Sequence, residues 1–178
     1  TYEELRELSY MGASVLHEEA VFPVRDAGIP LVIKNTNAPG DPGTIISETA
    51  KEGDSEPIIT GIAGKRGFLA INVARDRTKS RIGFMRRALS VFERYGVSVE
   101  HMPTGVDQFA AVVQASDVKD SLYSLISDIQ EEVEPLEIEV VENLALIATV
   151  GRNLRGRPGI SGHLFGMLGQ EGVSVRMI

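Results

Sequence analysis

The sequence of 178 residues contains no cysteine and no tryptophan, and aromatic residues make up only 6% of it. The lack of cysteine excludes disulfides, thiolate nucleophiles and cysteine-bound metals, and the scarcity of aromatics predicts an aliphatic core. Lys and Arg number 18 against 25 Asp and Glu, a net charge of −7, which argues against a general nucleic-acid or membrane-surface binder. No apolar run approaches the ~20 residues that span a bilayer, and no signal peptide is recognisable, so a cytoplasmic protein is expected.

What remains is a chain able to bury a core. Hydrophobic residues make up 43% and charged residues 24%, and the length allows one domain or two small ones. The chain starts at Thr1 without an initiator Met, and its last residues, 173–178, have the pattern of a strand. Natural domains seldom end inside a strand, because backbone groups are then left unpaired. We therefore expect a fragment of a longer protein.

The N-terminal third alternates helical and loop-like patterns. Residues 3–28 have helical periodicity, and Pro23 predicts a break or a new helix start within them. Short strands are expected at 29–34 and 44–46, on either side of a loop rich in Pro, Gly and Asn. The polar stretch 48–56 is expected to be a linker, and the domain boundary is placed there.

From residue 57 the pattern is that of a small α+β domain. Apolar faces with helical spacing predict helices at 83–95 and 117–132, the second capped by Asp117. The expected strands have β-rich or alternating sequences and lie at 57–63, 68–73, 97–102, 108–113 and 136–140. Counted from Phe68, the order is β-α-β-β-α-β, the ferredoxin-like topology.

The pattern then repeats with an offset of 76 residues and no gap. Gly83 corresponds to Gly159, and the sequence Gly-Val-Ser-Val of residues 96–99 recurs unchanged at 172–175. The strand 68–73 corresponds to 144–149. Such an ungapped match of strand, loop, helix and strand indicates an internal repeat, whose second copy stops after its first β-α-β half.

Two adjacent units of this kind resemble a pair of ACT domains, the small amino-acid-sensing modules. The resemblance is carried by the strand 143–151, the turn Arg-Pro-Gly-Ile at 157–160 and the helix that ends at Gly172. Residues 4–17, and the stretch from Ala-Gly-Ile-Pro at 27–30 to Pro-Gly-Thr at 42–44, look like the end of an aspartate kinase catalytic domain. His-Met-Pro-Thr-Gly at 101–105 is similar to the first ACT unit of single-function, lysine-sensitive aspartokinases.

The resemblance implies tandem ferredoxin-like ACT domains preceded by a helical segment from the end of an amino-acid kinase domain. The expected division is 1–47 for the end of the kinase domain, 48–56 for the linker, 57–141 for the first ACT domain and 142–178 for an incomplete second one. The parent enzyme would use ATP and Mg²⁺ to phosphorylate the β-carboxylate of aspartate. No Gly-rich phosphate-binding signature is found here, so the fragment alone is expected to be inactive and to hold no cofactor.

A basic stretch joins the first ACT strand to its helix. Arg75, Arg77, Lys79 and Arg81 are followed by Arg86 and Arg87, and the second copy carries Arg152, Arg155 and Arg157. These residues are either an entrance for an anion such as an amino acid's carboxylate, at a helix N-terminus, or simply a solvated face. Nucleic-acid binding is disfavoured by the overall charge and the lack of interleaved aromatics.

In aspartokinases with this pattern, the lysine effector lies between the first helix and second strand of the first ACT unit. Glu100 and Asp107 are candidates to hold its ammonium group. The resemblance implies an effector site with the helix side formed by Ser80, Gly83, Phe84 and Met85, and the strand side by Ser98, Val99, Glu100, Thr104 and Asp107. From the residues alone, Phe84 and Val99 are equally well explained as core positions.

No catalytic or metal-binding constellation stands out. The three histidines, His17, His101 and His163, have no spacing typical of a metal site, and His163 is expected to be an exposed helix residue. The acidic run between Glu131 and Glu139 is most simply a solvated helix end and strand face.

The expected function is therefore feedback regulation by lysine, or by threonine, in a homodimer that pairs through its ACT domains and acts on the parent kinase domain. The effector would shift the population toward an inhibited arrangement. Three alternatives stay open: a natural small regulatory subunit made by internal initiation, a stand-alone ACT sensor, and a dimerisation module that binds no ligand.

Overall fold

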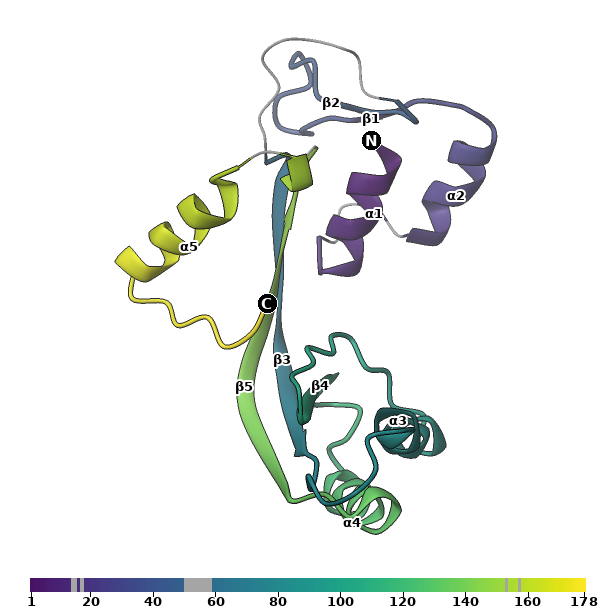
Figure 1. Ribbon diagram of the computed structural model, residues 1–178. Helices are drawn as coiled ribbons and strands as arrows, with labels where there is room; N and C mark the ends of the chain where they lie inside the picture. Colours follow the sequence, from purple (N-terminus) through teal and green to yellow (C-terminus); the bar gives the residue numbers. More distant parts are fainter. Residues whose placement is uncertain (14–15, 17, 50–58, 153, 157) are drawn as a thin grey trace. The chain divides into compact units, whose positions relative to one another are not determined.

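A computed structural model of the chain describes residues 1–13, 16, 18–49, 59–152, 154–156 and 158–178. The chain forms two compact units (Figure 1). Unit 1 comprises Thr1–Lys65 and Leu146–Ser174, and unit 2 comprises Arg66–Ala145 and Val175–Ile178. Each unit thus takes residues from separate stretches of the chain. The expected sequential division into kinase end, linker and two ACT domains stays a prediction. The predicted linker 48–56 lies outside the described residues from residue 50 onward.

Unit 2 is built on the antiparallel sheet β4-β3-β5, formed by β3 (Gly61–Ala74), β4 (Gln108–Gln114) and β5 (Glu137–Val150). β3 pairs with β4 from Phe68↔Gln114 to Ala74↔Gln108. On the other side of β3, Leu136 N donates to Ala74 O (2.8 Å) and Thr60 N donates to Val150 O (2.9 Å), so β5 runs antiparallel to β3. β3 and β5 each contribute residues to both units.

Two helices, α3 (Phe84–Arg94) and α4 (Leu122–Val133), cover one face of this sheet and contact each other. The core between helices and sheet is aliphatic, as expected, with Phe84, Phe92 and Phe109 as its buried aromatic side chains. Its fully buried members include Ile71, Val91, Leu125 and Ile129. The helices therefore turn their apolar stripes toward a common interior, and each strand contributes every second residue to it.

The ferredoxin-like β-α-β-β-α-β order is confirmed, but its second strand is irregular. The expected strand 97–102 contributes one isolated bridge to β4, at His101↔Val112, and a second bridge lies just beyond it, at Thr104↔Phe109. Glu100 N donates to Val112 O (2.8 Å), and Ala110 N donates to Pro103 O (3.0 Å). Pro103 has no N–H to donate, which accounts for the broken ladder at this edge.

Four other predictions about the helices and strands were wrong. The strands expected at 57–63 and 68–73 merge into β3, although residues 57–58 lie outside the described part, and 136–140 merges with the following strand into β5. Asp117 does not cap α4, because residues 117–120 form turns and the helix begins after Ser121. No strand is assigned within 173–178.

Unit 1 begins with α1 (Tyr2–Tyr10) and α2 (Glu18–Asp26), followed by the two-stranded sheet of β1 (Leu31–Ile33) and β2 (Thr44–Ile46). The predicted break at Pro23 is wrong, because this proline lies inside α2 and its carbonyl accepts from Ala27 N (3.2 Å). Pro23 comes after only one full turn of a nine-residue helix and removes a single helical N–H, so the helix continues.

The rest of unit 1 holds the short 3₁₀ helix η1 (Leu154–Gly156) and α5 (Ile160–Gln170). The N-terminal elements have a small core of their own, with Tyr2, Val21 and Ile46 buried.

The internal repeat extends to backbone geometry. α3 and α5 have bounds exactly 76 residues apart, and each starts after a left-handed glycine, Gly83 (φ +74°) or Gly159 (φ +89°), with no side-chain cap. Arg87 N donates to Gly83 O (2.9 Å), and in the second copy His163 N donates to Gly159 O (2.9 Å). The positive φ at both helix starts favours glycine, since other residues are strained there.

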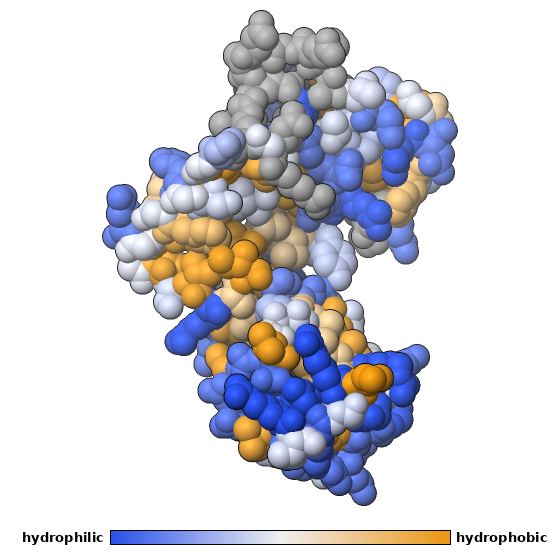
Figure 2. Space-filling model, in the orientation of Figure 1, coloured by the Kyte–Doolittle hydropathy of each residue, from blue (hydrophilic) through white to orange (hydrophobic). Residues whose placement is uncertain are grey.

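The two copies differ in how their helices are covered. α3 buries four residues, Phe84, Ala88, Val91 and Phe92, whereas α5 has none that is buried. Met167 is 53% exposed, and hydrophobic side chains gather at the surface over α5 (Figure 2). The apolar face that forms a core in the first copy is therefore open in the second within the described residues.

This difference predicts unequal effects of truncation in the two helices. Phe92→Ala removes a side chain that is 1% exposed and should lower the free energy of unfolding of unit 2 by about 3–5 kcal/mol. The control is Met167→Ala at the position equivalent to Val91, which should change stability by no more than about 0.5 kcal/mol. Urea unfolding followed by circular dichroism measures both, and equal losses would contradict the assignment of the two faces.

Candidate functional site

The basic loop between β3 and α3 is organised by one arginine. The guanidinium of Arg75 donates to Lys79 O (2.6 Å) and to the carboxylate of Asp107. The backbone N–H of Arg75 donates to Asp107 O (2.7 Å), so the end of β3 and the start of β4 are joined twice. The Arg75 side chain is only 12% exposed. Arg75 thus holds the loop from inside, whereas the side chains of Arg77, Lys79 and Arg81 are exposed to solvent.

Asp107 is held by two arginines of its own chain. In addition to Arg75, Arg77 Nε lies 2.9 Å from Oδ2 of Asp107. The hydrogen bond from Arg75, followed by the charges of both arginines, holds the pKa of the Asp107 carboxyl below its usual range. The carboxylate expected to face a ligand ammonium group is therefore ionised and already paired within the chain.

A second contact ties the loop to the end of α4. Lys79 forms an ion pair with Glu134, and its Nζ lies 3.4 Å from Glu134 O. Glu134 caps the C-terminus of α4 with a left-handed backbone (φ +42°). The hydrogen bond from Lys79 lowers the pKa of Glu134. Both side chains are exposed, so this pair adds little to stability but restricts the loop.

On the helix side, the predicted residues divide into core and surface. Phe84 is buried and meets Phe109 edge to face, with ring centroids 5.9 Å apart, and Met85 packs against the same core. Ser80 is exposed, and its hydroxyl accepts from Ile82 N (3.2 Å). Gly83 supplies the left-handed start of α3. The free surface at this end is therefore the helix N-terminus itself, flanked by exposed Arg81 and Arg86.

On the strand side, Ser98 is exposed and Val99 packs against the core. Glu100 is half-buried, and its backbone bonds to β4. Thr104 bridges to Phe109, whose ring in turn contacts Phe84. Phe109 thus links the strand-side and helix-side residues, whereas Asp107 is connected to the basic loop.

Sequence reasoning missed a hollow of about 470 Å³ in unit 2. Asn72 Nδ2 donates to Glu139 Oε2 (2.9 Å) in this hollow, and Glu137 is nearby on the same strand. The alternation of Glu137 and Glu139 along β5 was the available signal, since it places both on one face. The hollow is lined by Asn72, Ala74, Pro103, Thr104, Gly105, Gln108, Phe109, Ala110, Glu137, Glu139, Arg176 and Met177.

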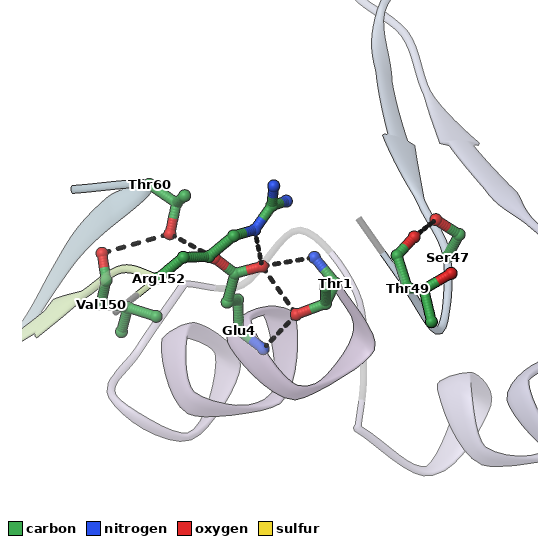
Figure 3. A network of polar contacts seen from close by, with 7 residues as sticks. All are labelled: Thr1, Glu4, Ser47, Thr49, Thr60, Val150 and Arg152. Atoms are coloured by element: carbon green, nitrogen blue, oxygen red, sulfur yellow. Dashed lines mark hydrogen bonds and ion pairs between the residues drawn. The ribbon is translucent and has the colours of Figure 1, made fainter. Parts of the chain in front are cut away.

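The second basic loop uses its arginine differently. Arg152, just after β5, donates from Nε to Glu4 Oε2 of α1 (3.3 Å), as Figure 3 shows. Arg157 and the side chain of Arg155 lie outside the described residues, as does His17. His163 is exposed on α5, as predicted. Across the described residues, no group of three or more His, Asp or Glu side chains could hold a metal ion.

In the part of the chain that the structure describes, no helix has the length and apolarity needed to cross a membrane.

A helix-covered β-α-β-β-α-β sheet, with its strand-helix half repeated, defines a regulatory module of the ACT class. In agreement, a family model described as an ACT domain matches residues 147–178. Aspartokinase 3 of Bacillus subtilis (strain 168) is 37% identical over 179 residues, covering 100% of this chain and 39% of the relative.

Two solved structures extend the comparison. The aspartate kinase of Clostridium acetobutylicum matches with a TM-score of 0.90 and 49% identity, over 99% of this chain and 41% of that one. E. coli aspartokinase III in complex with lysine and aspartate matches with a TM-score of 0.71 and 25% identity, over 99% of this chain and 38% of that one. Over its whole length the chain is homologous to part of the aspartokinases, and it has the fold of their ACT-containing regulatory region. It spans about two fifths of the length of these relatives.

The pairing of Asp107 gives a prediction about its titration. Arg75→Gln removes the principal donor, so the pKa of Asp107 should rise toward the ordinary value of about 3.9. Because the folded-state pKa is lowered, this group stabilises the fold above its ordinary pKa, and the contribution is lost as pH falls through the folded pKa. Carbon NMR of the carboxyl group measures the shift. Arg86→Gln, on the exposed side of α3, is the control and should leave the titration unchanged.

Proposed function

We propose that this chain is the feedback-sensing region of an aspartate kinase and that it binds an end-product amino acid, with lysine favoured over threonine. The observation that carries the proposal is that the whole of this chain matches part of the aspartokinases, including an E. coli homologue solved with lysine and aspartate. The parent enzyme would transfer the γ-phosphate of ATP to the β-carboxylate of aspartate. ATP and Mg²⁺ belong to its kinase domain, and no residue of this chain is assigned to them.

The start of α3 is suited to the effector's α-carboxylate. An uncapped helix N-terminus offers free N–H groups and a partial positive charge, and Gly83 keeps the approach to the backbone open. Exposed Arg81 and Arg86 add positive charge on either side of it. Phe84 and Met85 act by holding this end of the helix in the core.

The strand side would supply the negative charge for an ammonium group. Glu100 is half-buried beside β4, and a charge-assisted hydrogen bond from an ammonium suits such a carboxylate. Asp107 would have a different role, because its carboxylate forms ion pairs with Arg75 and Arg77. It fixes the basic loop that leads to Ser80 and Gly83, so it positions the helix side of the site.

Inhibition would follow from unequal affinity for two arrangements of the parent enzyme. A ligand shifts an equilibrium only by the ratio of its affinities for the two states, and a change from 1:99 to 99:1 needs a ratio of about 10⁴. The proposal includes a homodimer formed through ACT domains, which allows two effector sites to act on one equilibrium. It also includes a cytoplasmic location.

A thermal-shift screen against the twenty common amino acids tests the sensing function. A true effector stabilises the chain by RT ln(1 + [L]/Kd), about 2.7 kcal/mol at 100 times its Kd. Lysine, or else threonine, should raise the melting temperature, whereas glycine should not. No shift with any amino acid would leave a structural dimerisation module as the function.

Substitution of the strand-side carboxylate tests the site. Glu100→Gln should weaken lysine binding about tenfold or more, because a charge-assisted hydrogen bond to the ammonium is lost. Glu93→Gln makes the same change on an exposed part of α3 and should leave affinity unchanged. Calorimetry with both variants measures the difference, and equal affinities would refute the assignment of Glu100.

A further inference from the structure

Glu4, in the first turn of α1, joins three parts of unit 1 (Figure 3). One oxygen, Oε2, accepts from the Thr1 hydroxyl (2.6 Å) and from Arg152 Nε (3.3 Å). The other, Oε1, accepts from the hydroxyl of Thr60 (2.9 Å). The Glu4 side chain is only 13% exposed, and both of its oxygens are used. This carboxylate is therefore a structural group with satisfied hydrogen bonds and not a solvated surface charge.

The partners of Glu4 mark one end of a two-stranded ladder. Thr60 immediately precedes β3, and Arg152 follows β5 by two residues. Thr60 is also bound to β5, since its backbone N–H donates to Val150 O (2.9 Å). A single side chain from α1 thus holds the start of one strand and the end of its neighbour together.

Apolar contacts place α1 along the same stretch of β3. A Cβ at Gly61 would come within 2.7 Å of Leu8 Cδ1, so this strand residue lies directly under the helix. A Cβ at Gly12 would meet Gly64 O at 3.4 Å, one turn beyond Leu8. From Gly61, β3 continues without a break to Ala74, next to Arg75 of the basic loop. α1 therefore contacts the first residues of β3, and the last residues of the same strand lead into the candidate effector site.

Helix capping accounts for only part of this arrangement. Thr1 and Glu4 form a capping box, which uses Oε2 and the backbone groups of the first turn. The Thr60 hydroxyl on Oε1 contributes nothing to the cap, and neither does Arg152. Burial raises the pKa of the Glu4 carboxyl, whereas the hydrogen bonds from the Thr1 and Thr60 hydroxyls lower it.

We propose that Glu4 is a positioning residue that couples α1 to the paired ends of β3 and β5, so that effector binding is transmitted to the kinase through this carboxylate. The inference rests on the proposed function, because α1 belongs to the segment that resembles the end of a kinase catalytic domain. When the carboxylate is lost, α1 is held less firmly to the strands, and effector binding is coupled more weakly to inhibition.

The test uses the full-length kinase that contains this chain, with three variants. Glu4→Gln removes the charge, and Thr60→Val removes the strand contact while it leaves the capping box intact. Glu7→Gln, an exposed change on the same helix, is the matched control.

Without any effector, amide hydrogen exchange of α1 should be about tenfold faster or more in Glu4→Gln, and several-fold faster in Thr60→Val. The Glu7→Gln variant should exchange like the parent. If Thr60→Val exchanged at the parental rate, Glu4 would be a helix cap only and the proposal would be overturned.

With lysine as the probe, the concentration for half-inhibition should rise about tenfold in Glu4→Gln, while the calorimetric Kd changes less than about twofold. Equal increases in both quantities, or no increase in either, would overturn the coupling role. If the parent enzyme were inhibited by neither lysine nor threonine, the proposed function would fail. The exchange rates of Glu4→Gln and Thr60→Val would then decide by themselves whether Glu4 couples α1 to the strands.

Discussion

The geometry of the candidate site depends on the ion pair between Arg75 and Asp107. A guanidinium that is 12% exposed must be paired, because an unpaired charge at this depth would be strongly destabilising. Arg75 meets this demand with the Asp107 carboxylate and the Lys79 carbonyl, although its Nε is buried without a partner. The loop from β3 to Gly83 is wrapped around this side chain, so the position of the α3 N-terminus follows from it.

In both copies of the repeat an arginine that follows a strand is paired with a carboxylate, but the carboxylates come from different parts of the chain. In the first copy, an arginine just after β3 holds a carboxylate that precedes β4. In the second, Arg152 just after β5 holds Glu4, which comes from a helix at the other end of the sequence. Each strand end is thus secured by an arginine and a carboxylate from elsewhere in the chain. The first copy closes its own core, and the second is joined to α1.

Periodicity and repetition predicted the elements whose information is local. The apolar stripe of 84–94, the apolar run within 108–113 and the 76-residue offset all correspond to observed elements. Predictions failed where a distant contact decides the outcome. Nothing in the sequence spacing of Arg75 and Asp107 reveals their pairing. The capping box of Thr1 and Glu4 can be recognised in the sequence. The contacts of Glu4 with Thr60 and Arg152 cannot, because these residues are distant in the chain.

The same limit applies to the site residues. The sequence pattern alone explains Phe84 and Val99 as core positions, and the structure agrees. Only the family resemblance assigned Ser80, Gly83 and Glu100 to a ligand. Pro103, read as part of a motif, turned out to matter for the sheet as well, since it interrupts the pairing with β4.

The long β3-β5 ladder contains two residues with positive φ. Its hydrogen bonds place Gly67 (φ +88°) opposite Asn143 (φ +60°). A Cβ built at Gly67 would meet nothing within 4 Å. The space around position 67 would admit almost any side chain, while the backbone torsion admits very few. The backbone torsion angle therefore limits which residues position 67 can accept, even though an added side chain would meet no neighbour.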